Sequence, residues 1–181
     1  MITEKEAVKI SKFLSLVLRH QPETISLVLD ENGWADVDIL IEKCNEKGVA
    51  LTRKLLEHIV ATNTKKRFSF NGQKDQIRAN QGHSIDVDLA LSAQIPPDVL
   101  YHGTAEQFVA SIKEQGLQKQ QRQHVHLSKE QSTAVQVGQR HGKPVVFSVS
   151  AGQMYQDGFV FYLSDNGVWL TDHVPAKYLS F

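Results

Sequence analysis

Apolar residues in the first quarter of the chain recur every three or four positions, which is the spacing of one buried face of an α-helix. The residues that follow this spacing are Ala7, Ile10, Leu14, Val17 and Leu18. Thr3 and Glu6 precede all of them at the spacing of a capping box, and Pro22 cannot continue a helix. We therefore predict a helix that begins after Thr3 and ends before Pro22.

Two more helices and a hairpin are predicted before residue 90. One helix covers about 37–47 and is closed by Gly48, and the next begins at Thr52. Alternating residues in 67–70 and 76–78 flank an Asn-Gly pair, which indicates a β-hairpin. Three helices followed by a hairpin is the order of a winged helix. Such modules often bind nucleic acid, but a fold alone does not establish a function.

The second half has many short apolar runs, which predict strands. They lie at 99–102, 124–127, 145–149, 159–163 and 168–171, with helices expected at 105–115 and about 129–138. Asp165-Asn166-Gly167 between the last two runs is a strong hairpin signal. We predict an α+β protein. Paired prolines in 92–98 indicate a linker, so the expected domains are 1–91 and 99–181.

Composition narrows the class of protein. The chain has 181 residues, of which 41% are hydrophobic and 22% charged, so it is expected to fold rather than remain disordered. It has no run of ~18 apolar residues and no apolar segment of signal length at its start, so we expect a soluble, cytoplasmic protein. Cys44 is the only cysteine, which excludes an internal disulfide and is typical of a small buried side chain.

The formal net charge is zero, but the charges are not evenly distributed. Residues 63–83 and residues 111–143 each contain four more basic than acidic side chains. Two basic stretches in a neutral protein suggest a local anionic ligand, although ordinary solvated charge explains this count better when it is taken alone. Neutral net charge favours modest, local affinity for nucleic acid over binding along a long groove.

Several segments in the first half could bind an anion, and for each of them an ordinary structural role is the alternative. Arg19 and His20 fall at the end of the first helix, where the helix dipole favours cations, but they also combine a phosphate fork with a titratable ring. Arg67 opens the hairpin, where a solvated basic face is the plain alternative. Arg78 with residues 81–84 can form either an anion-binding concavity or a simple turn.

Candidate chemistry in the second half lies in two segments. In Tyr101-His102-Gly103-Thr104, glycine permits close approach of a ligand, and Thr104 can alternatively cap a helix. In 122–128, Arg122, His124 and His126 are expected on one face of a strand. His-x-His can hold zinc, but the sequence supplies no further ligand nearby. Glu130 is the last glutamate, so a later carboxylate base is poorly supported.

The ordered set of these segments resembles the RNA 2'-phosphotransferases, which use NAD to remove the 2'-phosphate left at a splice junction by some tRNA ligases. The segments that carry the resemblance are 11–15, Leu18-Arg19-His20, Lys66-Arg67-Phe68, Arg78 with 81–84, 101–104, 122–128 and 166–171. The resemblance implies a winged-helix lobe that binds RNA phosphate, followed by a β-rich, ADP-ribosyltransferase-like lobe that binds NAD.

The resemblance also implies residue roles. The family's catalytic Arg-His-Arg-Arg set falls on Arg19, His20, Arg67 and Arg122. The residues implied in NAD binding are His102, Gly103, Thr104, His126 and Ser128. NAD is consumed and no metal is required. Expected partners are NAD and an RNA that carries a 2'-phosphate, with no membrane, and the protein is expected to be a monomer.

Two other functions stay open from the sequence. One is a non-catalytic winged-helix protein that binds nucleic acid. The other is an ADP-ribosyltransferase that caps terminal phosphates of nucleic acids or modifies proteins. The clustered histidine and arginine of the second half argue against the first, and the missing late glutamate argues against protein modification.

Overall fold

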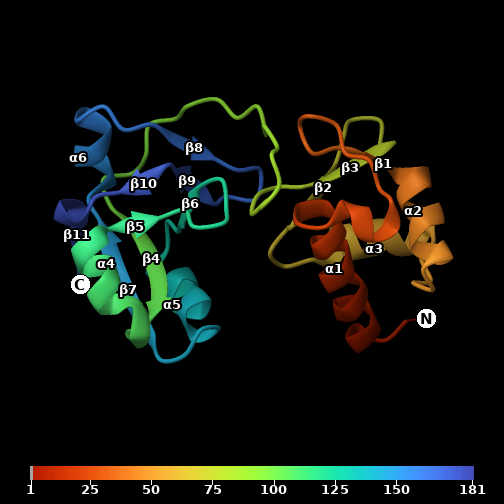
Figure 1. The fold of residues 1–181 in the computed structure, drawn as a ribbon, viewed down its shortest axis with the longest axis horizontal. Helices are drawn as coiled ribbons and strands as arrows, with labels where there is room; N and C mark the ends of the chain where they lie inside the picture. Colours follow the sequence, from red (N-terminus) through yellow and green to blue (C-terminus); the bar gives the residue numbers. More distant parts are fainter. Residues whose placement is uncertain (1) are drawn as a thin grey trace. The chain divides into compact units, whose positions relative to one another are not determined.

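The computed structural model describes residues 2–181 as two compact units, the first ending at Ala90 and the second comprising Leu91–Phe181 (Figure 1). Each unit has its own hydrophobic core. Helices and small antiparallel sheets occur together in both units, which confirms the predicted α+β class. Within the described residues, no helix is both long and apolar enough to cross a membrane.

The first unit contains three α-helices, one short 3-10 helix and a three-stranded sheet. Its elements are α1 (Glu4–Arg19), η1 (Pro22–Ile25), β1 (Ala35–Asp36), α2 (Val37–Glu46), α3 (Arg53–Thr62), β2 (Phe68–Phe70) and β3 (Gln76–Ala79). The sheet order is β1-β3-β2, and all pairings are antiparallel. The three predicted helices and the predicted hairpin are confirmed.

Local signals explain the ends of these helices. Thr3 and Glu6 form the predicted capping box, with the Glu6 N–H donating to Thr3 Oγ1 at 3.2 Å. Thr52 Oγ1 caps α3 by accepting from the Leu55 N–H at 3.2 Å, and Gly48 adopts a left-handed φ of 81° after α2. Asp36 caps α2 and also lies in β1, a two-residue strand too short to produce a periodic pattern.

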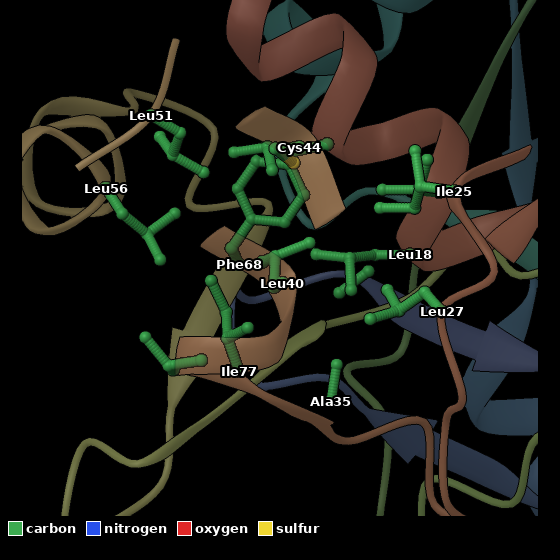
Figure 2. Close-up of a cluster of buried hydrophobic side chains, with 14 of the residues drawn as sticks. Leu18, Ile25, Leu27, Ala35, Leu40, Cys44, Leu51, Leu56, Phe68 and Ile77 are labelled. Atoms are coloured by element: carbon green, nitrogen blue, oxygen red, sulfur yellow. The ribbon is translucent and has the colours of Figure 1, made fainter. Parts of the chain in front are cut away.

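The core of the first unit forms where the helices meet the inner face of the sheet. Figure 2 shows Leu18, Leu40, Phe68 and Ile77 pointing toward one another from four different elements. Cys44 lies among them, fully buried, and burial raises the pKa of its thiol to about 11. The prediction that Cys44 is a small buried side chain is confirmed.

The second unit is built from short strands and helices. Its elements are β4 (Leu100–Ala105), η2 (Glu106–Phe108), α4 (Val109–Gln115), β5 (Leu117–Gln118), β6 (Val125–Leu127), α5 (Gln131–Gln139), β7 (Pro144–Val149), α6 (Ala151–Gln156), β8 (Phe161–Leu163), β9 (Trp169–Thr171), β10 (His173–Val174), η3 (Ala176–Tyr178) and β11 (Leu179–Ser180). The sheets have the orders β11-β7-β4, β6-β9-β8 and β10-β5. The predicted β8–β9 hairpin is confirmed.

Two expectations about the second unit need correction. Thr104 does not cap a helix, because β4 continues through Ala105 and the Thr104 side chain is buried within it. Arg122 does not lie on a strand with His124 and His126, because β6 begins only at Val125. The short elements β5, β10, β11 and α6 were not predicted, since none is long enough for a periodic pattern.

The stretch 92–98 is extended and makes backbone hydrogen bonds within the second unit. The Gln94 N–H donates to the Phe161 carbonyl at 2.8 Å, and the Asp98 carbonyl accepts from the Gly152 N–H at 3.0 Å. Paired prolines prevent regular structure here, but they do not prevent individual backbone contacts.

Candidate active site

The first unit brings Arg19 and His20 to the C-terminal end of α1, as predicted. Both side chains are half-buried, and His20 is the C-cap residue with a non-helical φ of −128°. Its N–H donates to the Leu16 carbonyl at 3.0 Å, so the backbone of the pair is fixed by the helix. The helix places one guanidinium and one imidazole at the end where the dipole favours positive charge.

A segment comprising residues 80–84, which follows β3 directly, contacts all three candidate residues of this unit. The Asn80 N–H donates to the Arg67 carbonyl at 2.9 Å, and the Ser84 N–H donates to the Arg19 carbonyl at 3.0 Å. The Ser84 hydroxyl lies 2.7 Å from His20 Nδ1. Residues far apart in sequence, such as His20 and Ser84, which are 64 positions apart, are therefore joined through this 80–84 segment.

Gly82 and His83 pack the middle of the 80–84 segment closely against Arg19. Gly82 has a left-handed φ of 87°, and a Cβ at this position would lie 3.5 Å from Arg19 Cζ. His83 is 1% exposed, and neither ring nitrogen has a hydrogen-bond partner within the described part of the chain. Sequence analysis identified residues 81–84 but could not foresee these contacts, which depend on tertiary packing.

The electrostatic environment of this cluster is cationic. Burial, together with the nearby charges of Arg19, Arg78 and His20, lowers the pKa of His83 to about 4. At neutral pH the His83 ring is therefore neutral among positively charged neighbours. Such a field favours an anion close to Arg19 and His20.

The Arg78 side chain is buried, and its contacts are with the interior of the first unit. It is 8% exposed, its guanidinium carbon lies 4.5 Å from the centre of the Trp34 ring, and its Nη1 donates to the Leu89 carbonyl at 3.3 Å. Arg78 is therefore part of the packing of the first unit. Residues 80–84, in contrast, contact the candidate residues Arg19, His20 and Arg67.

In the second unit, β4 and β6 hold a network around two histidines. His102 Nδ1 lies 3.0 Å from the His126 carbonyl, and Arg122 Nη1 lies 3.0 Å from His126 Nδ1. Because a carbonyl only accepts and a guanidinium only donates, His102 carries a proton on Nδ1 and His126 Nδ1 is an acceptor. In neutral His102 the second ring nitrogen, Nε2, is then an acceptor.

Ser128 and Tyr101 join the same two segments through their backbones. Each N–H donates to the other residue's carbonyl at 2.8 Å. This reciprocal pair fixes the end of the 122–128 segment against β4, next to the contact between His102 and the His126 carbonyl. His102, His126 and Ser128 are therefore brought together within this unit.

Burial shapes the charge states in this network. It lowers the pKa of His102, and the nearby Arg122 charge lowers it further, so the ring is neutral at pH 7. Burial of the guanidinium also lowers the pKa of Arg122, although much of the residue is exposed. Within the described part of each unit, neither Arg67 nor Arg122 forms a salt bridge with a carboxylate.

Gly103 faces helix α5, and the close packing of this helix is one reason why a glycine is needed at this position. A Cβ on Gly103 would lie 1.7 Å from the Ala134 carbonyl oxygen, and a Cβ on Gly138 would lie 2.5 Å from the Thr104 carbonyl oxygen. The two glycines therefore allow α5 to lie directly on β4. Because side chains alternate along a strand, His102 and Thr104 point to the opposite face from Gly103.

The His-x-His segment does not assemble a metal-binding cluster among residues 2–181. No group of three or more His, Cys, Asp or Glu side chains with suitable placement occurs in this range. His124 instead packs against Tyr162, with ring centres 5.7 Å apart, and His126 contacts Arg122.

These features define an α+β protein in which Arg67 and Arg122 form no salt bridge with a carboxylate within the described part of their own units, which is a site chemistry suited to phosphate. The family model of "RNA 2'-phosphotransferase, Tpt1 / KptA family" matches residues 5–173, and the chain belongs to this family. A relative from Flavobacterium johnsoniae, described as a probable RNA 2'-phosphotransferase, is 58% identical over 180 residues and is covered to 99%, as is this chain.

Relatives from other bacteria have the same description. One from Trichormus variabilis is 57% identical over 172 residues, which covers 95% of this chain and 94% of the relative. Another from Rhodopirellula baltica is 53% identical over 182 residues, covering 100% and 99% respectively. The resemblance identified from sequence motifs is confirmed, and the family relationship indicates a transferase.

Proposed function

We propose that this protein removes an internal 2'-phosphate from RNA by transferring it to NAD. The products are RNA with a 2'-hydroxyl, ADP-ribose 1'',2''-cyclic phosphate and nicotinamide. The observation that supports this proposal most strongly is the presence of Arg67 and Arg122 without a carboxylate partner in their own described units. Guanidinium groups that are not neutralised internally are available to a phosphate.

In the first step, an oxygen of the RNA 2'-phosphate attacks the anomeric carbon of the nicotinamide ribose. The new carbon–oxygen bond replaces the bond to nicotinamide, which leaves. Phosphate is already anionic at pH 7, so this step requires no general base. This accounts for a site in which arginine and histidine predominate and in which Glu130 is the last glutamate of the chain.

In the second step, the neighbouring ribose 2''-hydroxyl loses its proton and attacks phosphorus, and the bond from phosphorus to the RNA 2'-oxygen breaks as that oxygen takes up one proton, so the protons balance. Negative charge increases on the phosphoryl oxygens, and we assign its stabilisation to Arg19, Arg67 and Arg122. We assign to His20 the proton that the departing RNA oxygen takes up. Arg19, His20 and Arg67 belong to the first unit, and Arg122 belongs to the second.

The donor set of the second unit suits NAD. Neutral His102 has its Nδ1 proton committed to the His126 carbonyl, so Nε2 can accept a hydrogen bond from a ribose hydroxyl. Neutral His126, with Nδ1 accepting from Arg122, carries its proton on Nε2 and can donate to a ligand oxygen. We assign NAD binding to these two residues with Gly103, Thr104 and Ser128.

The direct test is to mix the protein, NAD and an oligonucleotide with one internal 2'-phosphate. The proposal expects nicotinamide and dephosphorylated RNA in equal amounts. Binding without turnover would instead support a non-catalytic nucleic-acid protein. Turnover only with terminal phosphates or protein acceptors would support the ADP-ribosyltransferase alternative.

Two variants test the role of charge in the second step. Arg67→Ala and Arg122→Ala should each slow that step by about 100-fold or more, so that ADP-ribosylated RNA accumulates while nicotinamide is still released. Arg53→Ala and Arg140→Ala are matched controls, since Arg53 pairs with Asp38 and Arg140 is an exposed residue after α5. If Arg67→Ala and Arg122→Ala both clear the intermediate as fast as the wild type, the charge argument fails.

A further inference from the structure

We propose that Ser84 is a positioning residue for His20, and that its hydroxyl fixes both the orientation of the imidazole and the nitrogen that exchanges a proton. Ser84 Oγ lies 2.7 Å from His20 Nδ1, a short hydrogen-bond distance. The inference rests on the proposed function, in which His20 protonates the departing RNA oxygen.

The backbone of Ser84 is fastened to the residue that precedes His20. The Ser84 N–H donates to the Arg19 carbonyl at 3.0 Å, and the His20 N–H donates to the Leu16 carbonyl at 3.0 Å. Both ends of the contact between Ser84 and His20 are thus tied to the last turn of α1. The hydroxyl meets Nδ1 because the two backbones are held in register, even though Ser84 itself is exposed.

The rest of the 80–84 segment makes this placement rigid. Gly82 adopts the left-handed conformation against Arg19, and His83 is almost completely buried. Asn80 holds the start of the segment through its bonds to the backbone of Arg67 and Lys66. A hydroxyl carried on such a segment is pre-positioned before any ligand binds.

A hydroxyl is suited to this role because it both donates and accepts. When His20 is neutral, the serine O–H donates to Nδ1, and the ring proton is on Nε2. When His20 is protonated, Nδ1–H donates to the serine oxygen. The ring keeps one orientation in both states, and Nε2 is the nitrogen at which the proton enters and leaves. Which nitrogen titrates is set by the partner of the other nitrogen.

The charged and titratable groups that neighbour His20 in this cluster include Arg19, Arg78 and His83. The arginines remain charged, and His83 stays neutral above its pKa of about 4. None of these groups changes its charge between pH 5 and 9. A change in the pH profile of the second step that Ser84→Ala causes and Ser111→Ala does not is therefore assigned to the contact between Ser84 and His20.

The test uses the full-length protein with ¹⁵N-labelled histidine and the variants Ser84→Ala and Ser84→Thr. Alanine retains the N–H that bonds Arg19 and removes only the hydroxyl, whereas threonine restores a hydroxyl. Ser111→Ala, which changes an exposed helical serine in the second unit, is the matched control. Nitrogen NMR reports the tautomer of neutral His20, and single-turnover assays follow each chemical step from pH 5 to 9.

The expected wild-type tautomer has its proton on Nε2, and Ser84→Ala should give a mixture of tautomers. Ser84→Ala should slow the second step about 10-fold, the effect of losing one hydrogen bond, and should shift its pH profile. Nicotinamide release should remain at the wild-type rate. Ser84→Thr should restore the tautomer and the rate.

Two results would overturn the inference: a wild-type ring with its proton on Nδ1, or a Ser84→Ala protein whose tautomer, pH profile and second step all match the wild type. If Ser84→Ala does not fold, the wild-type spectrum and Ser84→Thr still decide. Failure of the proposed function is a separate observation, because it removes NAD-dependent turnover from the wild type while the spectrum still reports the contact between Ser84 and His20.

Discussion

Replacing His83 with a side chain that cannot titrate should flatten the pH dependence of the first unit's stability. In the folded protein, burial and the neighbouring cations lower the pKa of His83 from the ordinary 6.5 to about 4. The unfolded chain has the ordinary value. Between these two pH values the unfolded state binds one proton that the folded state does not, so acid favours unfolding and stability rises with pH.

The size of the effect follows from the two pKa values. Each pH unit between them changes the free energy of unfolding by about 1.4 kcal/mol, so the wild type should lose about 3 kcal/mol through His83 between pH 7 and pH 4. His83 is 1% exposed, so solvent does not screen this effect appreciably. His83→Gln should lose about that much less over the same range.

The measurement is urea unfolding at several pH values, with ¹⁹F NMR of fluorotryptophan to separate the two units. Trp34 reports on the first unit and Trp169 on the second. Carboxylates and the other histidines titrate in both proteins and therefore cancel in the difference between them. Parallel stability curves for Trp34 in wild type and His83→Gln would refute the reasoning, as would a difference confined to Trp169.

Three further outcomes are expected. Gly103→Ala should destabilise the second unit by about 3 kcal/mol or more in urea unfolding, because its Cβ would meet the Ala134 carbonyl at 1.7 Å, whereas Gly72→Ala, with no atom within 4 Å of its Cβ, should be nearly neutral; equal effects would contradict the packing argument. Cys44, fully buried and with its thiol pKa raised to about 11, should react with iodoacetamide at pH 8 only after unfolding, as mass spectrometry would show; rapid labelling of native protein would contradict this. Turnover should be unchanged in excess chelator, and activity that is lost there and restored by zinc would return attention to His124 and His126.

Local sequence patterns predicted those parts of the fold that depend on neighbouring residues. Thr3 and Glu6 lie one helical turn apart, and Asp165-Asn166-Gly167 is a local turn between β8 and β9, so both could be identified from sequence. The helix-end position of Arg19 and His20 was predictable for the same reason. The strand assignment of Arg122 failed because its backbone N–H bonds to Lys119 in a turn before β6 begins.

Local sequence patterns could not predict the contacts between residues that are distant in sequence. The hydrogen bond between Ser84 and His20 spans 64 positions, and nothing in the local sequence of either residue indicates the other. The need for glycine at 103 has the same origin, since the atom that excludes a Cβ belongs to Ala134 on another element. The family resemblance pointed to both segments, but their physical contacts required the three-dimensional structure.

A cluster of positive charge for which we propose a phosphate ligand has to remain folded when no phosphate is bound. Arg19, Arg78 and His20 all act on the same buried ring, and a further charge at His83 would add repulsion in a place that water does not reach. An imidazole whose pKa lies far below neutrality occupies that place without adding charge. The same property that makes the cluster compatible with folding at pH 7 makes it fail in acid, since protonation of His83 introduces the charge that the packing excludes.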